Sequence, residues 1–326
     1  MNFGVYWAQQ FLNGLSVGSQ YALMAVGLAM VFGILRLINF AHGDVMMVAA
    51  YIGAFSLAAQ VPLPLALLLV LLGTVLTGLL MERAAYRLLR RAPAVAVLLS
   101  SFAVGQILQN GTLLLSRLIN QPVQMAFPTP DILQGAVLFN TFFGDLRLSR
   151  INLVSLIAGP ILLVLLIIFI RRTTLGLSMR ATAEDLQAAQ LMGIDTNRVI
   201  MWAFVIGSLL AAVAGVLYAS QAGQIKPDMG FTPVLKAFIA AVIGGFGSIP
   251  GAMIGGYVLG FLEVLLTALP GYGDLIRGSA SPEVVTFLQT YLPTTLSRYR
   301  DAFVFVALIV LLLVRPGGIL GTVDKE

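Results

Sequence analysis

Apolar stretches recur along the whole 326-residue chain, and they restrict it to a membrane environment. A transmembrane helix needs about 20 mostly apolar residues, and most of the stretches approach that length, while several are shorter. They are Phe11–Leu35, Val45–Ala59, Leu63–Met81, Ala94–Leu115, Ile151–Ile170, Val199–Tyr218, Val234–Gly245, Gly251–Leu269 and Ala302–Val314. The pattern predicts an all-α polytopic membrane protein with about 8–9 transmembrane helices and two broken or short segments.

Composition agrees with that prediction and excludes several classes of protein. Hydrophobic residues make up 59% of the chain and charged residues 10%, whereas soluble domains average about 45–50% and about 25%. A water-soluble enzyme, a nucleic-acid-binding module and a disordered protein are therefore excluded. The net charge of +5 is typical of a membrane protein with Lys and Arg on its cytoplasmic loops. Because cysteine is absent, disulfides and thiolate metal sites are excluded.

The distribution of cations predicts how the chain is oriented. No Lys or Arg precedes the first apolar stretch, so we expect a retained helix rather than a signal peptide, with the N-terminus outside. Nine crossings then place the C-terminus in the cytoplasm. The cations expected inside are Arg36, Arg83, Arg87, Arg90, Arg91, Arg171, Arg172, Arg180, Arg198, Arg315 and Lys325. The remaining cations fall outside, mostly on two longer outer loops at about 117–150 and 270–301.

Two breaks interrupt the apolar pattern, one in each half of the chain. The first is the polar segment Ile38–Asp44, and the second is the glycine-rich segment Gly244–Gly251. Paired interruptions are typical of discontinuous helices in transporters. The candidate residues for a translocation path in these breaks are Asn39, His42, Asp44, Gly245 and Gly247.

Each break has two possible roles. In the first, the polar residues either order the turn, with Asp44 capping the next helix, or face a cavity where a helix N-terminus binds a substrate carboxylate. In the second, glycine serves either tight packing or direct substrate contact. Two small-residue pairs, Gly251/Gly255 and Gly256/Gly260, follow that break and permit close contact between helices.

Few charges lie within or near the spans. Glu263 interrupts the stretch Tyr257–Leu269, where a charge is costly, so we expect it to face a pathway or a subunit interface. The alternative is that it reaches the outer interface or pairs with a cation. Lys226 and Asp228 form either a surface ion pair or a contact with a partner protein. Glu82 is interpreted as a charge at an interfacial helix end.

The hydrophilic segment 171–198 contains a short amphipathic helix at about 178–192. Its apolar residues recur at helical spacing, which predicts one stripe. The stripe comprises Met179, Ala183, Leu186, Ala189 and Met192. Thr182–Asp185 fits a capping-box pattern, Gly193 lies where a helix end is expected, and Asp195–Thr196 offers the next N-cap.

The polar face of this helix predicts what it contacts. It carries Glu184, Asp185, Gln187 and Gln190, an acidic and neutral set that does not suit an anionic membrane surface. A protein partner on the cytoplasmic side is therefore favoured over lipid headgroups.

Four segments resemble a known family of membrane proteins. Arg180–Ile194 is similar to the coupling loop of bacterial ABC importer permeases, in which an acidic, Ala-rich helix precedes a glycine. Gly14–Leu23, Ile38–Asp44 and Gly244–Ala252 resemble the permeases of branched-chain amino-acid importers. The resemblance spans nearly the whole chain except 120–150 and 270–300. Where the family has Glu after His-Gly, this chain has Asp44.

The resemblance implies a single transmembrane permease domain over residues 1–326, in a bacterial inner membrane. Such a permease has no cofactor and no enzymatic activity of its own. Its partners are a second related permease chain, two cytoplasmic ATPase subunits and an extracytoplasmic binding protein that delivers substrate. The residues expected to couple it to the ATPase are Arg180, Glu184, Asp185, Ala188, Ala189 and Gly193.

The residue types present support a transport permease over an ATPase, a metal-binding protein or an intramembrane enzyme. No lysine belongs to a Gly-Lys-Ser/Thr phosphate-binding loop, and His42, the only histidine, excludes a multi-histidine metal site. No nucleophile–base arrangement for an intramembrane enzyme can be assembled. The alternatives are a related importer for urea, short amides or aromatic acids, and an ion-coupled secondary carrier. The expected path residues are thus those of the two breaks together with Glu263.

Overall fold

The computed structural model describes residues 3–320 except 91, 142–143 and 277–280. Within these residues, six helices are long and apolar enough to cross a membrane: α1 (Phe3–Leu35), α3 (Leu63–Met81), α5 (Ala94–Leu118), α6 (Arg150–Arg172), α9 (Thr196–Ala222) and α11 (Ile249–Ile276). Three apolar helices are shorter: α2 (His42–Ala58), α10 (Phe231–Gly244) and the part of α13 (Leu292–Val314) that follows a kink at Tyr299. Each predicted apolar stretch overlaps one of these helices, so the predicted polytopic helical fold is confirmed.

Smaller elements connect the apolar helices. They are η1 (Glu82–Tyr86), α4 (Arg87–Leu89), η2 (Asp131–Leu133), α7 (Thr174–Glu184), α8 (Leu186–Leu191), α12 (Pro282–Thr286), η3 (Phe287–Tyr291) and the strands β1 (Met125–Ala126), β2 (Ala136–Thr141), β3 (Gly144–Ser149) and β4 (Gln224–Ile225). Two of the predicted inner cations, Arg91 and Lys325, lie outside the described residues.

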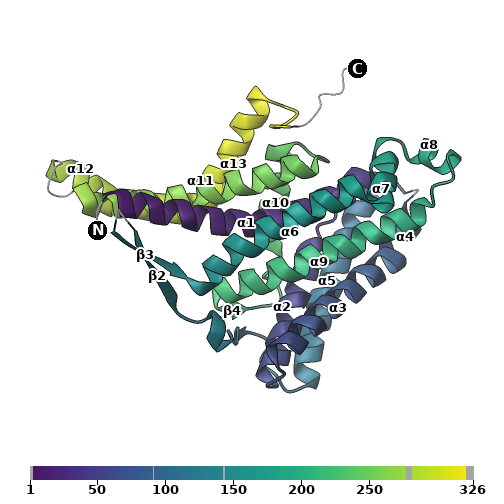
Figure 1. The fold of residues 1–326 in the computed structure, drawn as a ribbon, viewed down its shortest axis with the longest axis horizontal. Helices are drawn as coiled ribbons and strands as arrows, with labels where there is room; N and C mark the ends of the chain where they lie inside the picture. Colours follow the sequence, from purple (N-terminus) through teal and green to yellow (C-terminus); the bar gives the residue numbers. More distant parts are fainter. Residues whose placement is uncertain (1–2, 91, 142–143, 277–280, 321–326) are drawn as a thin grey trace.

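Helix α1 lies at the centre of the bundle, where it packs against α11, α9, α10 and α6 (Figure 1). Glycines let α1 and α11 approach closely, because a Cβ atom at Gly260 would overlap the backbone of Gly18, and one at Gly256 would also overlap α1. Gly251 and Gly255 contact α10 instead. The two predicted small-residue pairs therefore pack two different faces of α11 against two helices.

The short helices α2 and α10 begin inside the bundle and meet at their N-terminal ends. A Cβ atom at Gly43 would overlap the carbonyl oxygen of Gly230, which immediately precedes α10. His42, the first residue of α2, lies against Gly27 of α1 and close to Gly207 of α9, both well inside their helices. Neither short helix is long enough to span a membrane alone. His42 of the first break therefore lies among α1, α2 and α9, not at an end of the bundle.

One end of the bundle carries the strands. Strands β2 and β3 form an antiparallel hairpin with Ala136 opposite Ser149, and β1 pairs with β4 through Met125 and Ile225. The hairpin contacts the beginning of α1, as Figure 1 shows beside the N-terminus. The predicted outer loop 117–150 thus contains ordered strands. The other, 270–301, is largely helical in its described part, because α11 extends to Ile276 and α12, η3 and α13 follow.

The opposite end of the bundle carries α7, α8 and the C-terminal segment. The backbone N–H groups of Ile319 and Leu320 donate to the carbonyls of Ile243 and Gly244, the last residues of α10, at 2.9 Å each. These carbonyls have no partner within their own helix, so the C-terminal segment satisfies them. The beginning of α1 lies beside the β2–β3 hairpin, whereas residues 319–320 lie against the end of α10 (Figure 1).

Candidate functional site

Asp44 is a buried carboxylate in the first turn of α2, and it faces α5. Its Oδ1 accepts a hydrogen bond from Gln109 Nε2 at 2.7 Å. Gly105 leaves room for it, since a Cβ atom there would overlap the carboxylate. The prediction that Asp44 caps α2 is wrong: the N-cap is Ala41 and no side chain caps the helix. The carboxylate turns to α5 because the amide of Gln109 offers it a donor there.

The other two polar residues of the first break are also buried. Asn39 Oδ1 accepts a hydrogen bond from the Tyr86 hydroxyl at 2.7 Å. His42 is 3% exposed, and its Nε2 has no hydrogen-bond partner among the residues that the structure describes. The three predicted residues Asn39, His42 and Asp44 therefore lie together in the interior, around the place where α2 begins.

A polar pocket of about 680 Å³ lies next to Asp44, on the side of the molecule that carries β4. Gln106 and Gln109 of α5 line it together with Gln224, Lys226 and Asp228. Lys226 Nζ lies 3.1 Å from Asp228 Oδ2 with both side chains exposed, so the predicted surface pair is present. Gln109 contacts both Asp44 and the pocket, and so connects the first break with this opening.

Glu263 belongs to a second buried cluster. Its Oε1 lies 2.9 Å from Lys236 Nζ, and its Oε2 accepts a hydrogen bond from the Tyr21 hydroxyl at 2.6 Å. The same ammonium lies 3.3 Å from Asp301 Oδ1. The alternative that Glu263 pairs with a cation is therefore observed. Its partner is not on an outer loop, where the remaining cations were expected, but within α10.

A further buried ion pair lies near the start of α9. Glu82 is 3% exposed and pairs with Arg90, which also donates to the side chain of Asn197 at the start of α9. Glu82 lies at the end of α3, as predicted, and its carboxylate is buried within the protein.

The hydrophilic segment 171–198 forms two helices, not one. Asp185 separates them as the N-cap of α8, because its Oδ1 accepts hydrogen bonds from the backbone N–H groups of Gln187 and Ala188 at 2.8 and 2.9 Å. The predicted capping box is therefore wrong, since Thr182 is buried within α7 and donates to the carbonyl of Ser178. Asp195 does cap α9, and Gly193 ends α8 with a positive φ of 83°.

The break at Asp185 changes which side chains of α7 and α8 are exposed. Met179 and Ala189 are buried as the stripe predicted, whereas Met192 is 82% exposed and does not belong to it. Of the expected coupling residues, only Ala189 is buried. The exposed ones are Arg180, Glu184, Asp185, Ala188 and Gly193. This surface, together with the exposed Leu191, is available for a partner.

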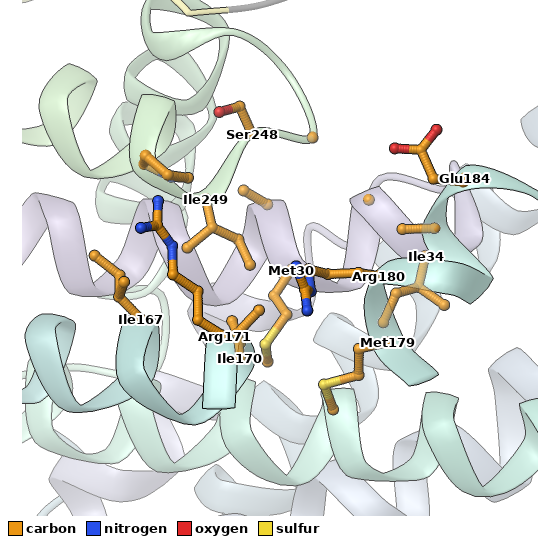
Figure 2. A pocket seen from close by; sticks show the side chains of 15 residues that line it. Met30, Ile34, Ile167, Ile170, Arg171, Met179, Arg180, Glu184, Ser248 and Ile249 are labelled. Atoms are coloured by element: carbon orange, nitrogen blue, oxygen red, sulfur yellow. The ribbon is translucent and has the colours of Figure 1, made fainter. Parts of the chain in front are cut away.

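A pocket of about 400 Å³ lies between α7 and the glycine-rich break. Arg180 and Glu184 of α7 line it together with Gly247. Figure 2 shows the charged groups around a group of apolar side chains from α1, α6 and α7. The structure thus places two expected coupling residues beside one residue of the second break. Gly245 is nearby, where the C-terminal segment contacts it through Gly318.

The predicted path residues therefore fall into three places. Asn39, His42 and Asp44 form one group, the glycines of the second break another, and Glu263 a third. Sequence reasoning missed Gln106, Gln109 and Lys236; polar side chains within apolar stretches were the available signal. Within the described ranges, no three His, Asp or Glu side chains gather as metal ligands would.

Comparison with known proteins identifies the family. Residues 10–314 match the family described as the permease component of the branched-chain amino acid transport system. The chain belongs to this permease family. No solved structure matches it.

Several curated relatives match nearly the whole length of this permease. It is 38% identical to the high-affinity branched-chain amino acid transport system permease protein BraD of Pseudomonas aeruginosa, over 98% of both chains. It is 39% identical to the corresponding protein LivH of Escherichia coli, over 99% of this chain and 98% of the relative. A probable branched-chain amino acid permease of Methanocaldococcus jannaschii is 27% identical, over 93% and 89%. The permease is a transport subunit of the ABC importer type, not an enzyme.

Proposed function

We propose that this permease imports branched-chain amino acids across a bacterial inner membrane. In this proposal it works with a second related permease chain, two cytoplasmic ATPase subunits and an extracytoplasmic binding protein. The printed names of its relatives support the substrate class, because both full-length bacterial relatives are branched-chain amino acid permeases. The clusters of arginine at 83–91 and 171–180 support an orientation with α7 and α8 in the cytoplasm and the N-terminus outside.

The proposed path rests on one observation, which is the low hydropathy and high exposure of helix α5. Of the six long apolar helices in the described chain, it is both the least apolar and the least buried. A helix that faces lipid should be the most apolar, as α3 and α6 are. The combination therefore indicates that α5 faces a partner chain or water.

Two amides mark the exposed face of α5. Gln106 and Asn110 are exposed near the middle of the helix, one turn apart. Their amides find partners only along α5 itself, where Gln106 donates to Gln109 at 3.3 Å and Asn110 to the Gln106 carbonyl at 2.8 Å, among the described contacts. In lipid, each unsatisfied polar group costs several kcal/mol, so this face suits a second permease chain with a polar path between the two.

The path in this proposal runs from the polar pocket past Gln106 and Gln109 to Asp44. The converging N-terminal ends of α2 and α10 lie beside it, and helix N-termini attract carboxylates such as that of an amino acid. Asp44 offers the opposite charge, which suits the ammonium of the same substrate. A zwitterion thus finds both of its charges matched along one route.

Coupling to ATP hydrolysis in this proposal occurs at α7 and α8. Helix α7 packs against α6, α1 and α9, so a push on it reaches three spans. The exposed residues of α8 provide the surface that an ATPase subunit contacts. Figure 1 shows α8 projecting from the bundle at this end.

The experiment uses the absence of cysteine in the chain. We expect Gln106→Cys to support ATP-dependent uptake of labelled leucine. This uptake should be lost when cells are treated with a positively charged, membrane-impermeant methanethiosulfonate. Modification places a cation in the path. Excess leucine during treatment should slow the loss.

The matched control is Leu72→Cys on α3, a residue that is 60% exposed on a face suited to lipid. Its uptake should survive the same treatment, as should that of the cysteine-free chain. If Gln106→Cys is labelled but still transports at the untreated rate, α5 does not line the path.

A further inference from the structure

The pocket between α7 and the second break is built from four segments that are far apart in sequence. They are the end of α1, the end of α6, helix α7 and residues 247–250. Its volume of about 400 Å³ accommodates a small molecule. The polar pocket beside Asp44 is a different opening, lined by different residues.

Aliphatic side chains form the interior of this pocket. Met30, Ile34, Ile170 and Met179 line it, and all four are less than a tenth exposed. Figure 2 shows them grouped between α1, α6 and α7. The interior therefore suits a branched or linear hydrocarbon group, which gains by leaving water.

Charged side chains of both signs surround that apolar interior. Arg171 and Arg180 carry guanidinium groups and Glu184 a carboxylate, and all three residues are exposed. In Figure 2, Arg171 and Glu184 lie at opposite ends of the pocket, with Arg180 between them. Guanidinium groups bind carboxylates through paired hydrogen bonds, and a carboxylate binds an ammonium group.

This combination matches one class of small molecule. An aliphatic amino acid has a carboxylate for the guanidinium of Arg171 and a hydrocarbon side chain for the interior. Its ammonium is on the same carbon as the carboxylate, so Glu184, at the other end of the pocket, attracts it at longer range. A phospholipid headgroup would share the arginines, and dependence of the effect on lipid composition distinguishes it from an amino acid. We propose that the pocket binds a free aliphatic amino acid from the cytoplasm and that its occupancy inhibits transport.

The location explains the inhibition. The pocket separates α7, which in the proposed function receives the movement of the ATPase, from the connection between α10 and α11. A ligand that contacts both sides fixes their separation, so movement of α7 is no longer transmitted. The inference rests on the proposed function for the substrate class and for the cytoplasmic location of α7.

The test uses the complete importer in vesicles with the ATPase side facing the lumen. ATP is enclosed with or without leucine, and the initial uptake of labelled leucine from the binding protein is measured. We expect luminal leucine to lower the initial rate several-fold. Luminal glycine, which has the same charges but no side chain, should inhibit only at much higher concentration.

Variants of neighbouring arginines provide the matched comparison. Arg171→Gln removes a carboxylate partner, so inhibition should require about tenfold more leucine, and Arg171→Lys should lie in between. Arg172→Gln changes an adjacent exposed arginine that does not line the pocket, and its inhibition should equal that of the wild type.

Several results would overturn the inference. One is an uptake rate that luminal leucine leaves unchanged; another is an identical response of Arg171→Gln and Arg172→Gln. A third is a rate that depends on Arg171 only through the content of anionic lipid, which would make the occupant a headgroup. Failure of the proposed function is distinct, since the wild type would then show no ATP-dependent leucine uptake in leucine-free vesicles.

Discussion

Lys236 joins four helices through one ammonium group. Its partners Glu263 and Asp301 lie on α11 and α13, and Tyr21 of α1 completes the cluster with a hydroxyl 3.2 Å from the ammonium. Removing one partner of a buried ion pair typically costs about 3–5 kcal/mol, because a charge is left in a medium that solvates it poorly. Because Lys236 has two carboxylate partners, removing its ammonium should cost more stability than removing one of the carboxylates.

We therefore predict that Lys236→Met lowers the melting temperature of the purified permease in detergent more than Glu263→Leu does. The first change removes the ammonium that Glu263, Asp301 and the Tyr21 hydroxyl share, whereas the second removes only one of the groups that contact it. Lys226→Met is the control, since Lys226 pairs with Asp228 at the surface, where such pairs contribute about 0–1 kcal/mol. Equal losses for Lys236→Met and Lys226→Met would contradict the prediction.

At this scale the sequence revealed that Glu263 is unusual but not what it contacts. A single carboxylate in an apolar stretch is visible without a structure. Its partner lies 27 residues away on another helix, and that pairing depends on how α10 and α11 are packed by glycine. The same limit applies to Asp44, whose partner Gln109 lies on a helix that no local pattern links to it.

At the scale of the element, Asp185 divides the segment 171–198 into two helices, α7 and α8. Its side chain satisfies two N–H groups at the start of α8 and thereby ends α7. Such competition between a side chain and the helical backbone is invisible to hydrophobic periodicity, which continues across the break. For this reason the sequence predicted one helix with Met192 in its apolar stripe, while the boundaries at Gly193 and Asp195 were correct.

We predict that Asp185→Ala destabilises α8 by about 0.5–2 kcal/mol, the usual cost of losing an N-cap. Faster hydrogen exchange at the amides of Gln187 and Ala188 should report this, and less ATPase should copurify with the permease. Asp185→Asn keeps a capping oxygen, so it should behave nearly as the wild type in both measurements. If Asn and Ala variants lose the ATPase equally, the negative charge rather than the cap makes the contact.

At the scale of the whole molecule, the two ends of the bundle differ in character. One end has the β2–β3 hairpin and the polar pocket, and the other has α7, α8 and the arginine-lined pocket. The order of the apolar helices could be predicted because apolar length is a local property, and their number agrees roughly with the predicted 8–9. The meeting of α2 with α10 could not, because it depends on contacts between glycines that are far apart in sequence.

We predict that Asn140→Cys, on the exposed hairpin, reacts with a membrane-impermeant maleimide added to intact spheroplasts. Gln187→Cys, exposed on α8, should react only after the membrane is opened. The chain has no other cysteine, so each signal belongs to one position. The reverse labelling pattern would show that the N-terminus lies inside.

The contact between the C-terminal segment and α10 has a consequence for biosynthesis. The carbonyls of Ile243 and Gly244 receive their hydrogen bonds from Ile319 and Leu320, which leave the ribosome much later. At about 5–20 residues per second, the delay over roughly 75 residues is about 4–15 s. Until then this end of α10 stays open, so the half-helix reaches its final environment only after Ile319 and Leu320 have been synthesised. Chaperones and the insertion machinery therefore meet a permease in which the end of α10 still lacks these hydrogen bonds.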